Sequence, residues 1–313
     1  GRPKAPKNKK VDSLSAPVIE VSHLSHKYGK RTIYDDLNFS VPPGKIYALL
    51  GKNGVGKTTL IKILMGFLRP VSGTCRVFGE DSYDLSPEAR ARIGLLFEGH
   101  LAYEFMSISQ IEQFYASFYP KWDQKVYYHL VDKLRLPHDH LVKNMSCGQR
   151  SQVVLGLIMA QQPELLLLDD YSIGLDAGYR RLFLDDMREY LAREERTVFL
   201  TSHVIQDMDD FVDEVIFLER GGNLLTTSLK DFKDRFRCFR LPKNGTAPSF
   251  ISLAHDPGMV KNIESHEDYF EIFSFSSRKN VAKYLVDNGV DAKGLEQVYM
   301  SLEDAFIGYT GRY

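Results

Sequence analysis

One nine-residue segment constrains the fold of this chain more than any other. It consists of Gly51, Lys52, Asn53, Gly54, Val55, Gly56, Lys57, Thr58 and Thr59. These residues satisfy the pattern G-x-x-x-x-G-K-[ST], in which glycines permit a tight turn that points backbone N–H groups at phosphate oxygens. The apolar residues 45–50 before it predict a strand, and residues 60–65 after it predict a helix whose positive end faces the same anion. The segment therefore predicts a phosphate-binding loop between a strand and a helix of an α/β domain.

Two side chains of this loop carry its expected chemistry. We expect Lys57 to reach the outer phosphates of a nucleoside triphosphate and the Thr58 hydroxyl to ligate a magnesium ion. The alternative is a glycine-rich turn that carries Lys-Thr by chance. The segments that follow weigh against this alternative.

An apolar run that ends in two acids is the second informative segment. Residues 165–168 are four leucines, and Asp169 and Asp170 follow them. Such a run is typical of a buried parallel strand, and ligands of parallel sheets bind at the carboxyl ends of the strands. We expect Asp169 to hold the magnesium ion, usually through water, and Asp170 to orient or deprotonate an attacking water. A plain acidic junction between strand and turn is the alternative.

The segment just before this strand resembles the signature of the ATP-binding-cassette (ABC) family, Leu-Ser-Gly-Gly-Gln at the start of a helix. Ser146, Gly148 and Gln149 match the signature, whereas Met145 and Cys147 depart from it. The resemblance implies that Ser146 and the N–H groups of the helix start bind the γ-phosphate of a nucleotide held by an opposite subunit. Taken alone, Ser-x-Gly-Gln is also consistent with an ordinary helix cap.

Further segments match the family in the same order along the chain, from residue 18 to about 228. Tyr28 corresponds to the aromatic residue that stacks on adenine, and residues 174–176 to the loop that crosses the dimer interface. Glu98 stands where most members carry a metal-sensing Gln, and His203 corresponds to the switch histidine that hydrogen-bonds the γ-phosphate. The resemblance thus implies catalytic roles for Lys57, Asp170 and His203, and metal contacts for Thr58, Glu98 and Asp169.

Changes in composition divide the chain into three expected parts. Residues 1–17 are rich in Lys and Pro and predict a disordered basic tail. Residues 18–236 form the expected ABC ATP-binding domain, with a helical subdomain at about 99–162. Residues 237–313 predict a small C-terminal α/β domain, since residues 269–275 alternate as a strand and a Ser301–Asp304 capping pair starts a last helix. The predicted fold class is α/β: a P-loop NTPase fold of the ABC type with a helical subdomain, plus this small domain.

Composition and charge exclude other classes of protein. Of the 313 residues, 43% are hydrophobic, which is enough for a buried core, and the net charge of −1 gives no argument for nucleic-acid binding. Three widely spaced cysteines form no metal-ligand pattern and indicate a reducing compartment. No apolar run approaches the ~20 residues needed to cross a bilayer. We therefore expect a cytoplasmic protein that is peripheral on the cytoplasmic face of a membrane.

Together these segments predict a hydrolase that uses ATP and Mg²⁺ to drive a separate integral membrane permease. Residues 301–306 resemble the end of ATPase subunits from exporting systems, so export is the expected direction. The expected partners are a second copy of the chain, in an ATP-sandwich homodimer, and the permease; nucleic acid is not an expected partner. A low-turnover ATP-binding regulatory module and a non-transport ABC ATPase stay open as alternatives.

Three departures from the family pattern bear on the rate. Asp170 replaces the usual Glu, which shortens the side chain by one methylene, and a misplacement of about 1 Å costs on the order of 100-fold in rate. Cys147 replaces a Gly that allows close approach to phosphate, and it puts a thiol near a helix start. Tyr171 stands where Pro is usual, and the sequence gives no physical account of it. We expect slow but real hydrolysis, with a non-hydrolysing switch as the alternative.

Overall fold

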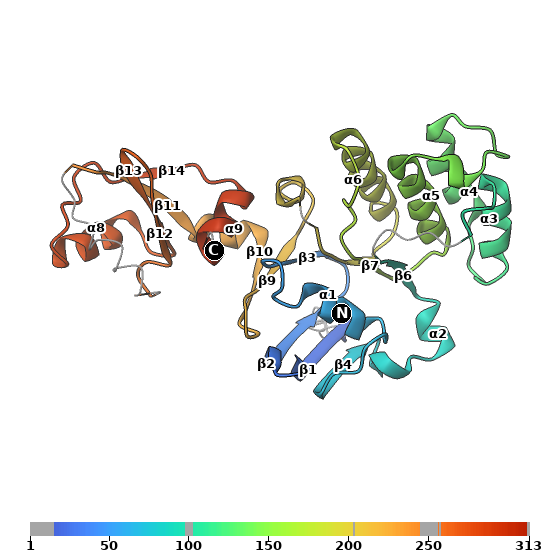
Figure 1. Cartoon of the computed structure of the whole chain (residues 1–313), viewed down its shortest axis with the longest axis horizontal. Coiled ribbons are helices and arrows are strands. Elements are labelled where there is room, and N and C mark those ends of the chain that lie inside the picture. The colour runs from blue at the N-terminus through green and yellow to red at the C-terminus, as the bar shows by residue number, and fades with distance from the viewer. Residues whose placement is uncertain (1–15, 98–102, 203, 245–255, 257, 312–313) are drawn as a thin grey trace, which may run out of the picture.

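The computed structural model describes residues 16–97, 103–202, 204–244, 256 and 258–311 (Figure 1). Two of the predicted site residues, Glu98 and His203, lie outside these ranges, as does the predicted basic tail up to residue 15. Among the described residues, none of the helices combines the length and the apolar character that crossing a bilayer requires.

A six-stranded sheet forms the centre of the molecule, in the order β10-β9-β3-β8-β7-β6. The strands are β3 (Ile46–Leu50), β6 (Ile93–Leu96), β7 (Leu165–Leu168), β8 (Thr197–Leu200), β9 (Glu214–Leu218) and β10 (Leu224–Ser228). All neighbours pair in parallel except β10, which is antiparallel to β9. Every residue of β7 and β8 is buried, as expected of parallel strands covered on both faces. The predicted strands at residues 45–50 and 165–168 are confirmed.

A second, antiparallel sheet packs below the central one, in the order β2-β1-β4-β5. Its strands are β1 (Ile19–Tyr28), β2 (Arg31–Val41), β4 (Ser72–Val77) and β5 (Glu80–Asp81). Helix α1 (Lys57–Leu64) lies between the two sheets (Figure 1), and its buried Leu60, Ile61 and Leu64 share one apolar core with both of them. The short helix α2 (Pro87–Arg90) begins after Ser86, whose side chain accepts the N–H of Ala89.

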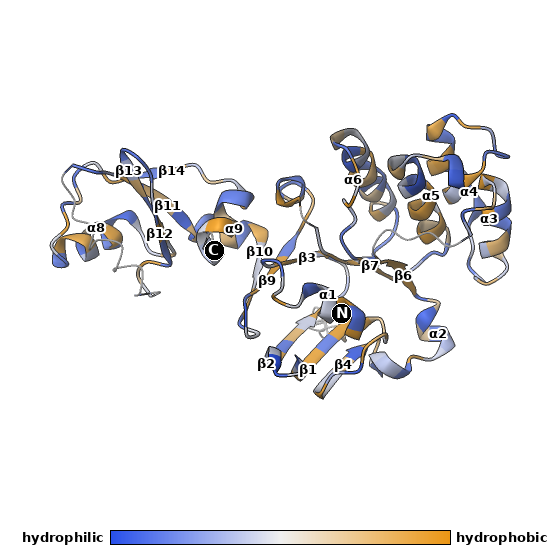
Figure 2. Ribbon diagram, in the orientation of Figure 1, coloured by the Kyte–Doolittle hydropathy of each residue, from blue (hydrophilic) through white to orange (hydrophobic). Residues whose placement is uncertain are grey.

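Helices α3 (Ile108–Ala116), α4 (Gln124–Val131) and α5 (Cys147–Ala160) form a separate helical layer beyond β6, with a core of its own. Helices α3 and α4 are separated by residues 117–123, which include Pro120. Helix α6 (Ala177–Leu191) joins this layer to the central sheet through Phe183 and Met187. Apolar colour runs along β6 and β7 and over much of α5 (Figure 2), in keeping with their burial.

The chain ends in a third sheet, in the order β12-β13-β11-β14. The C-terminal unit comprises β11 (Arg237–Pro242), β12 (Asn262–Ser265), β13 (Tyr269–Ser274), α8 (Arg278–Asp287), β14 (Glu296–Val298) and α9 (Leu302–Thr310). Helix α8 packs on one face of the sheet through Val281 and Leu285.

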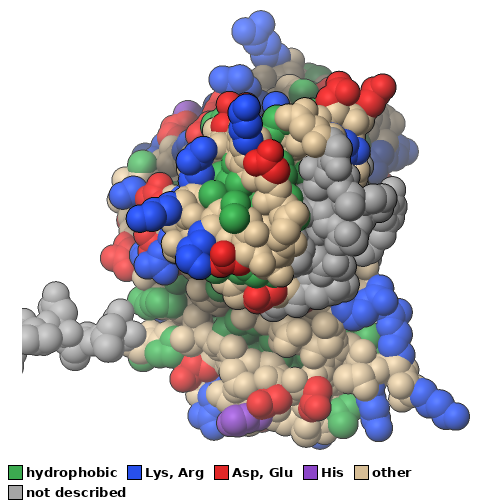
Figure 3. Space-filling view, turned by 90° about the vertical axis from the view of Figure 1, so that its left-hand side faces the viewer, with side chains coloured by type: hydrophobic (Ala, Val, Ile, Leu, Met, Phe, Trp, Pro, Cys, Tyr) green, Lys and Arg blue, Asp and Glu red, His purple; other side chains and the backbone are tan. Residues whose placement is uncertain are grey.

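On the surface that Figure 3 shows, basic and acidic side chains are interspersed rather than gathered by sign.

Helix α9 ties the C-terminal unit to the rest of the molecule. Its Leu302 and Ala305 join the large core that also contains Phe217 of β9 and Phe232 of α7 (Leu229–Arg235). The ring of Tyr309 lies 5.0 Å from that of Phe217. This helix therefore packs against both the C-terminal sheet and the ATP-binding part of the chain.

The contact between α9 and β13 predicts an unusual response to a glycine substitution. A Cβ atom at Gly308 would lie 2.2 Å from Cδ1 of Phe273, which is buried. Glycine-to-alanine changes inside helices normally stabilise by about 1 kcal/mol. Here overpacking, which costs about 1–3 kcal/mol, is expected to outweigh that gain, so Gly308→Ala lowers the urea midpoint of unfolding.

Gly178 of α6 is the matched control for this substitution. It is an exposed helical glycine, and a Cβ there would meet only the Asp176 carboxylate, at 3.4 Å. Gly178→Ala is therefore expected to hold or raise the midpoint. A raised midpoint in Gly308→Ala would show that α9 does not pack on Phe273 as described.

Candidate functional site

The predicted phosphate-binding loop connects the end of β3 to the start of α1. Gly54 and Gly56 adopt φ values of 82° and 109°, a region that favours glycine. A Cβ atom at Gly56 would lie 2.5 Å from Cγ2 of Ile33 and 2.6 Å from Cε1 of Tyr34, both on β2. The loop is thus pressed against the second sheet, and a side chain at position 56 would force it away.

The start of α1 differs from the starts of the other helices. Helices α2 to α9 each begin after a Ser or Asp whose side chain accepts a hydrogen bond from the first turn. Gly56 caps α1 without any such side chain, and the first turn holds no acidic residue. The N–H groups of this helix start are left for an external acceptor, which is the arrangement that binds phosphate.

Lys57 lies at the centre of the loop. Its Nζ donates a hydrogen bond to the carbonyl oxygen of Gly51. Burial lowers the pKa of this ammonium, while Asp170 and Asp169 act in the opposite direction. The charged amine therefore lies in a partly desolvated position facing two acids, where a bound polyphosphate would also favour its charged form.

The two acids at the end of β7 are held by a residue from the next strand. Thr201, directly after β8, donates its hydroxyl to Oδ1 of Asp169 at 2.7 Å. Oγ1 of Thr201 also accepts the backbone N–H of Asp170 at 2.9 Å. Asp169 is buried, and Asp170 has a positive φ of 51°. Thr201 thus holds the carboxylate of Asp169 and the backbone of Asp170.

These elements surround one open cleft of about 240 Å³. Its lining comprises Tyr28, Arg31, Ile33, Asn53, Gly54, Gly56, Lys57, Thr58, Thr59, Asp169, Asp170, Thr201 and Ser202. Of the predicted loop residues, Gly51, Lys52 and Val55 do not line it. Tyr28 is 47% exposed, and its hydroxyl lies 3.2 Å from Oγ1 of Thr59. The lining of the cleft therefore combines an aromatic ring with two acids.

Four lining residues were not predicted from the sequence: Arg31, Ile33, Thr201 and Ser202. Arg31 donates from Nη2 to the carbonyl oxygen of Gly54 at 2.9 Å, which adds a positive charge beside the loop. Thr201 lies two residues before His203 in the sequence. A polar residue at the carboxyl end of a strand next to the double-acid strand was the signal that could have identified Thr201.

The donor set fits magnesium and a triphosphate. The Asp169 and Asp170 carboxylates and the Thr58 hydroxyl are the hard oxygen donors that Mg²⁺ prefers. Lys57, Arg31 and the uncapped start of α1 are complementary to phosphate.

The signature residues lie elsewhere in the chain and outside this cleft. Ser146 and Gln149 form a capping box: Ser146 Oγ accepts the N–H of Gln149 at 3.2 Å, and Gln149 Oε1 accepts the N–H of Ser146 at 3.0 Å. A Cβ at Gly148 would lie 2.2 Å from the Tyr179 ring. Cys147 is exposed, and its Sγ lies 3.8 Å from the carbonyl oxygen of Ile173. Within one chain, these residues start α5, and a phosphate role for them stays a prediction.

Comparison with known proteins agrees with the resemblance found in the sequence. Residues 34–172 match the family model described as ABC transporter. The bacitracin transport ATP-binding protein BcrA of Bacillus licheniformis is 28% identical over 305 residues, which is 94% of this chain and 97% of the relative. The Nod factor export ATP-binding protein I of Rhizobium johnstonii is 29% identical over 306 residues, covering 96% and 97%. The family model and these relatives together indicate an ABC transporter ATPase subunit.

Solved structures of ABC proteins share the fold of this chain. The ATP-binding subunit of an ABC transporter superposes with a TM-score of 0.60 at 23% identity, over 69% of this chain and 92% of that one. A bacterial Atm1-family ABC exporter with ATP bound gives a TM-score of 0.59 at 21% identity, over 73% and 42%. The predicted recognition and fold class are confirmed.

The structure also accounts for one departure from the family pattern. Tyr171, where Pro is usual, is buried, and its ring stacks on that of Phe183 at 4.9 Å and 18°. The ring anchors the turn after the two acids to α6. In this chain, an aromatic contact therefore supports the turn at that position.

The Thr201 hydroxyl gives a testable prediction about the rate. Thr201→Val removes the bonds to Asp169 and Asp170 while keeping the side-chain shape. Because a misplacement of about 1 Å costs on the order of 100-fold in rate, we expect kcat for ATP hydrolysis to fall by roughly 10- to 100-fold. Thr201→Ser retains the hydroxyl and is expected to restore most of the activity. Equal rates in the valine and serine variants would contradict the role given to the hydroxyl.

Proposed function

We propose that this chain is the ATP-hydrolysing subunit of an exporter and that it works as a homodimer on a separate membrane permease. The observation that carries the proposal is the cleft, in which the sheet edge assembles Lys57, Thr58, Asp169 and Asp170 while the signature residues of the same chain remain outside. Export is favoured because relatives over nearly the whole chain are named for bacitracin transport and Nod factor export. The proposed location is the cytoplasmic face of the membrane.

Each group in the cleft has a proposed role. Lys57 and the start of α1 bind the triphosphate, Thr58 and Asp169 hold Mg²⁺, and Tyr28 stacks on adenine. Bound magnesium supplies charge neutralisation at the phosphate oxygens. Asp170 orients the attacking water, and Thr201 holds the backbone of Asp170. Glu98 as a metal contact and His203 as a γ-phosphate contact rest on the family resemblance.

A second copy completes the site in this proposal. Ser146 Oγ already accepts the N–H of Gln149, so its own proton remains for donation to a γ-phosphate oxygen. In this proposal the backbone N–H of Gly148, in the first turn of the same helix, also faces the γ-phosphate. We assign residues 18–236 to the ATP-binding domain, and within it residues 99–162 to a helical subdomain that contacts the permease. Residues 237–313 form the accessory domain.

A low-turnover regulatory module is the second candidate, and Asp170 is the observation that favours it. Its carboxylate is one methylene shorter than the family's Glu, and its backbone is fixed at a positive φ by the bond to Thr201. A clamped backbone gives the shorter side chain little freedom to extend toward the attacking water. The two candidates therefore predict different rates of phosphate release: measurable turnover for the transporter subunit and little or none for the regulatory module.

Substitutions at Asp170 and Lys57 separate these candidates. The unmodified chain is expected to release phosphate slowly, and Asp170→Glu is expected to raise kcat by as much as about 100-fold because it restores the reach of the carboxylate. Lys57→Ala is expected to abolish turnover. Asp185→Glu, the same change at an exposed surface acid paired with Arg188, is the control and leaves kcat unchanged.

The outcomes lead to different conclusions. Turnover that survives Lys57→Ala would contradict the proposed site, and turnover that appears only after Asp170→Glu would favour the regulatory module.

The permease partner is checked by purification from native membranes, where an integral membrane protein is expected to remain bound. A fully active preparation that lacks one would argue against the transporter.

A further inference from the structure

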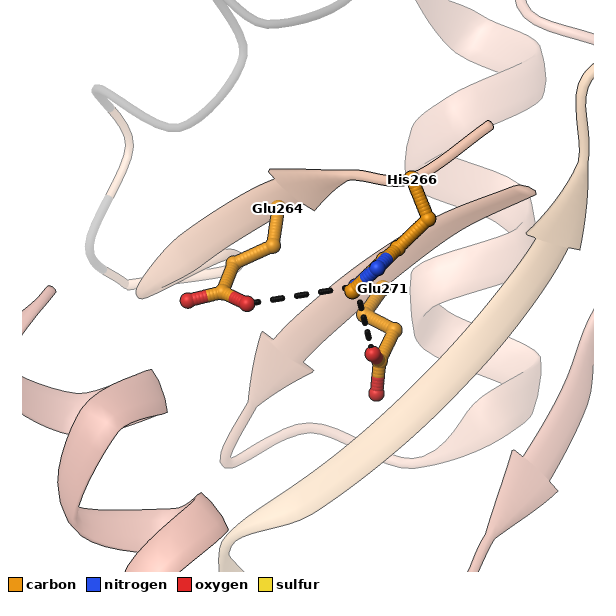
Figure 4. Close-up of side chains that lie close together, drawn as sticks. All are labelled: Glu264, His266 and Glu271. Carbon is orange, nitrogen blue, oxygen red and sulfur yellow. Dashed lines mark ion pairs between the residues drawn. The ribbon is translucent and has the colours of Figure 1, made fainter. Parts of the chain in front are cut away.

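Three side chains that the proposed function does not use converge in the C-terminal unit (Figure 4). Glu264 belongs to β12, Glu271 to β13, and His266 lies in the turn that joins them. Nε2 of His266 lies 2.6 Å from Oε1 of Glu271 and 3.9 Å from Oε2 of Glu264. One ligand atom from each residue lies within 4.8 Å of the others. The imidazole thus lies between two carboxylates.

The strand register forces the two carboxylates together. Glu264 and Glu271 are direct partners across the antiparallel β12–β13 pair. Like charges in that position destabilise a sheet. Their side chains are only 10% and 18% exposed, so water compensates little of the repulsion. The sheet therefore needs a positive charge at this point.

The turn holds His266 in place to share that charge. Its backbone N–H donates to the carbonyl oxygen of Tyr269 at 2.9 Å, and its ring stacks on the Tyr269 ring at 4.7 Å and 22°. Arg240, opposite Glu271 on β11, directs its guanidinium over the Tyr269 ring, 4.6 Å from the ring centre. An imidazole nitrogen and two carboxylate oxygens thus face one another in a mostly buried place, where a divalent cation would neutralise both carboxylates.

We propose that Glu264, His266 and Glu271 bind one divalent transition-metal ion of the Zn²⁺ type. Imidazole nitrogen with carboxylate oxygens is a donor set that suits this class of ion, and three protein ligands leave a fourth position for water. With metal–ligand bonds of about 2.0–2.2 Å, tetrahedral ligand atoms lie about 3.3 Å apart. The observed separations of 2.6 Å and 3.9 Å fall on either side of that value. The third separation, between the two carboxylate oxygens, is at most 4.8 Å, so side-chain adjustments would be enough to form the site.

A buried thiol orients one of the ligands. Sγ of Cys238, on β11, donates to Oε2 of Glu271 at 3.2 Å. The other oxygen of Glu271, Oε1, is thereby directed toward His266. Such outer partners typically change metal affinity by about 10–100-fold.

Zinc binding by the full chain tests the site. Chelator-treated protein without nucleotide is titrated with Zn²⁺ in competition with a chromophoric chelator, and bound metal per chain is counted. One zinc per chain is expected at this site, with an affinity loss of at least about 100-fold in His266→Asn or Glu271→Gln. Cys238→Ala is expected to weaken binding by about 10–100-fold. Circular dichroism confirms that each variant is folded, and Glu264→Gln provides a further ligand variant should another fail to fold.

Two controls separate this inference from other sources of binding. His138→Asn removes an exposed histidine paired with Asp132 at 2.8 Å and is expected to leave zinc binding unchanged. Lys57→Ala is expected to lose nucleotide and keep zinc, so failure of the nucleotide site does not affect this result. Absence of stoichiometric zinc in the unmodified chain would overturn the proposal. Equal affinity in His266→Asn and the unmodified chain would do so as well.

Discussion

The bond network around the Thr201 hydroxyl is the interaction on which the nucleotide cleft depends. It connects the ends of two parallel strands, β7 and β8, and fixes both acids that follow β7. The register sets this up, since Leu168 pairs with Leu200 and the next residue of each strand carries the polar group. Because β3 pairs with the other edge of β8, the same end of the sheet also carries the phosphate loop. Buried leucines thus determine where the chemistry lies.

The loop and the helix after it complete the cleft by leaving polar groups for a ligand. Gly56 replaces the capping side chain that other helices of this chain have, so the N–H groups of α1 are available to an anion. Lys57 is partly buried beside them, and its lowered pKa reflects the cost of that burial. A bound polyphosphate would accept hydrogen bonds from the free N–H groups and offset the buried charge of Lys57. Nucleotide binding would therefore stabilise the folded cleft.

The sequence predicts well what depends on neighbouring residues. The strand-loop-helix at residues 45–65, the buried strand before Asp169, and the helix starts at Ser146 and Ser301 all follow from local pattern and are confirmed. Contacts between distant segments were not predicted. The bonds of Thr201, the stacking of Tyr171 on Phe183, and the packing of α9 against Phe217 each depend on which strands pair and which faces meet. The Glu264–His266–Glu271 cluster was also missed, because only the register of β12 on β13 places the glutamates opposite each other.

One measurement tests the central claim that two copies of this chain enclose the nucleotide. Light scattering of Asp170→Asn, in which hydrolysis is blocked, gives the molar mass with and without ATP and Mg²⁺. The account predicts the mass of one chain without nucleotide and twice that mass with it, whereas Lys57→Ala stays at the single-chain mass. A single-chain mass in Asp170→Asn saturated with bound ATP would contradict it.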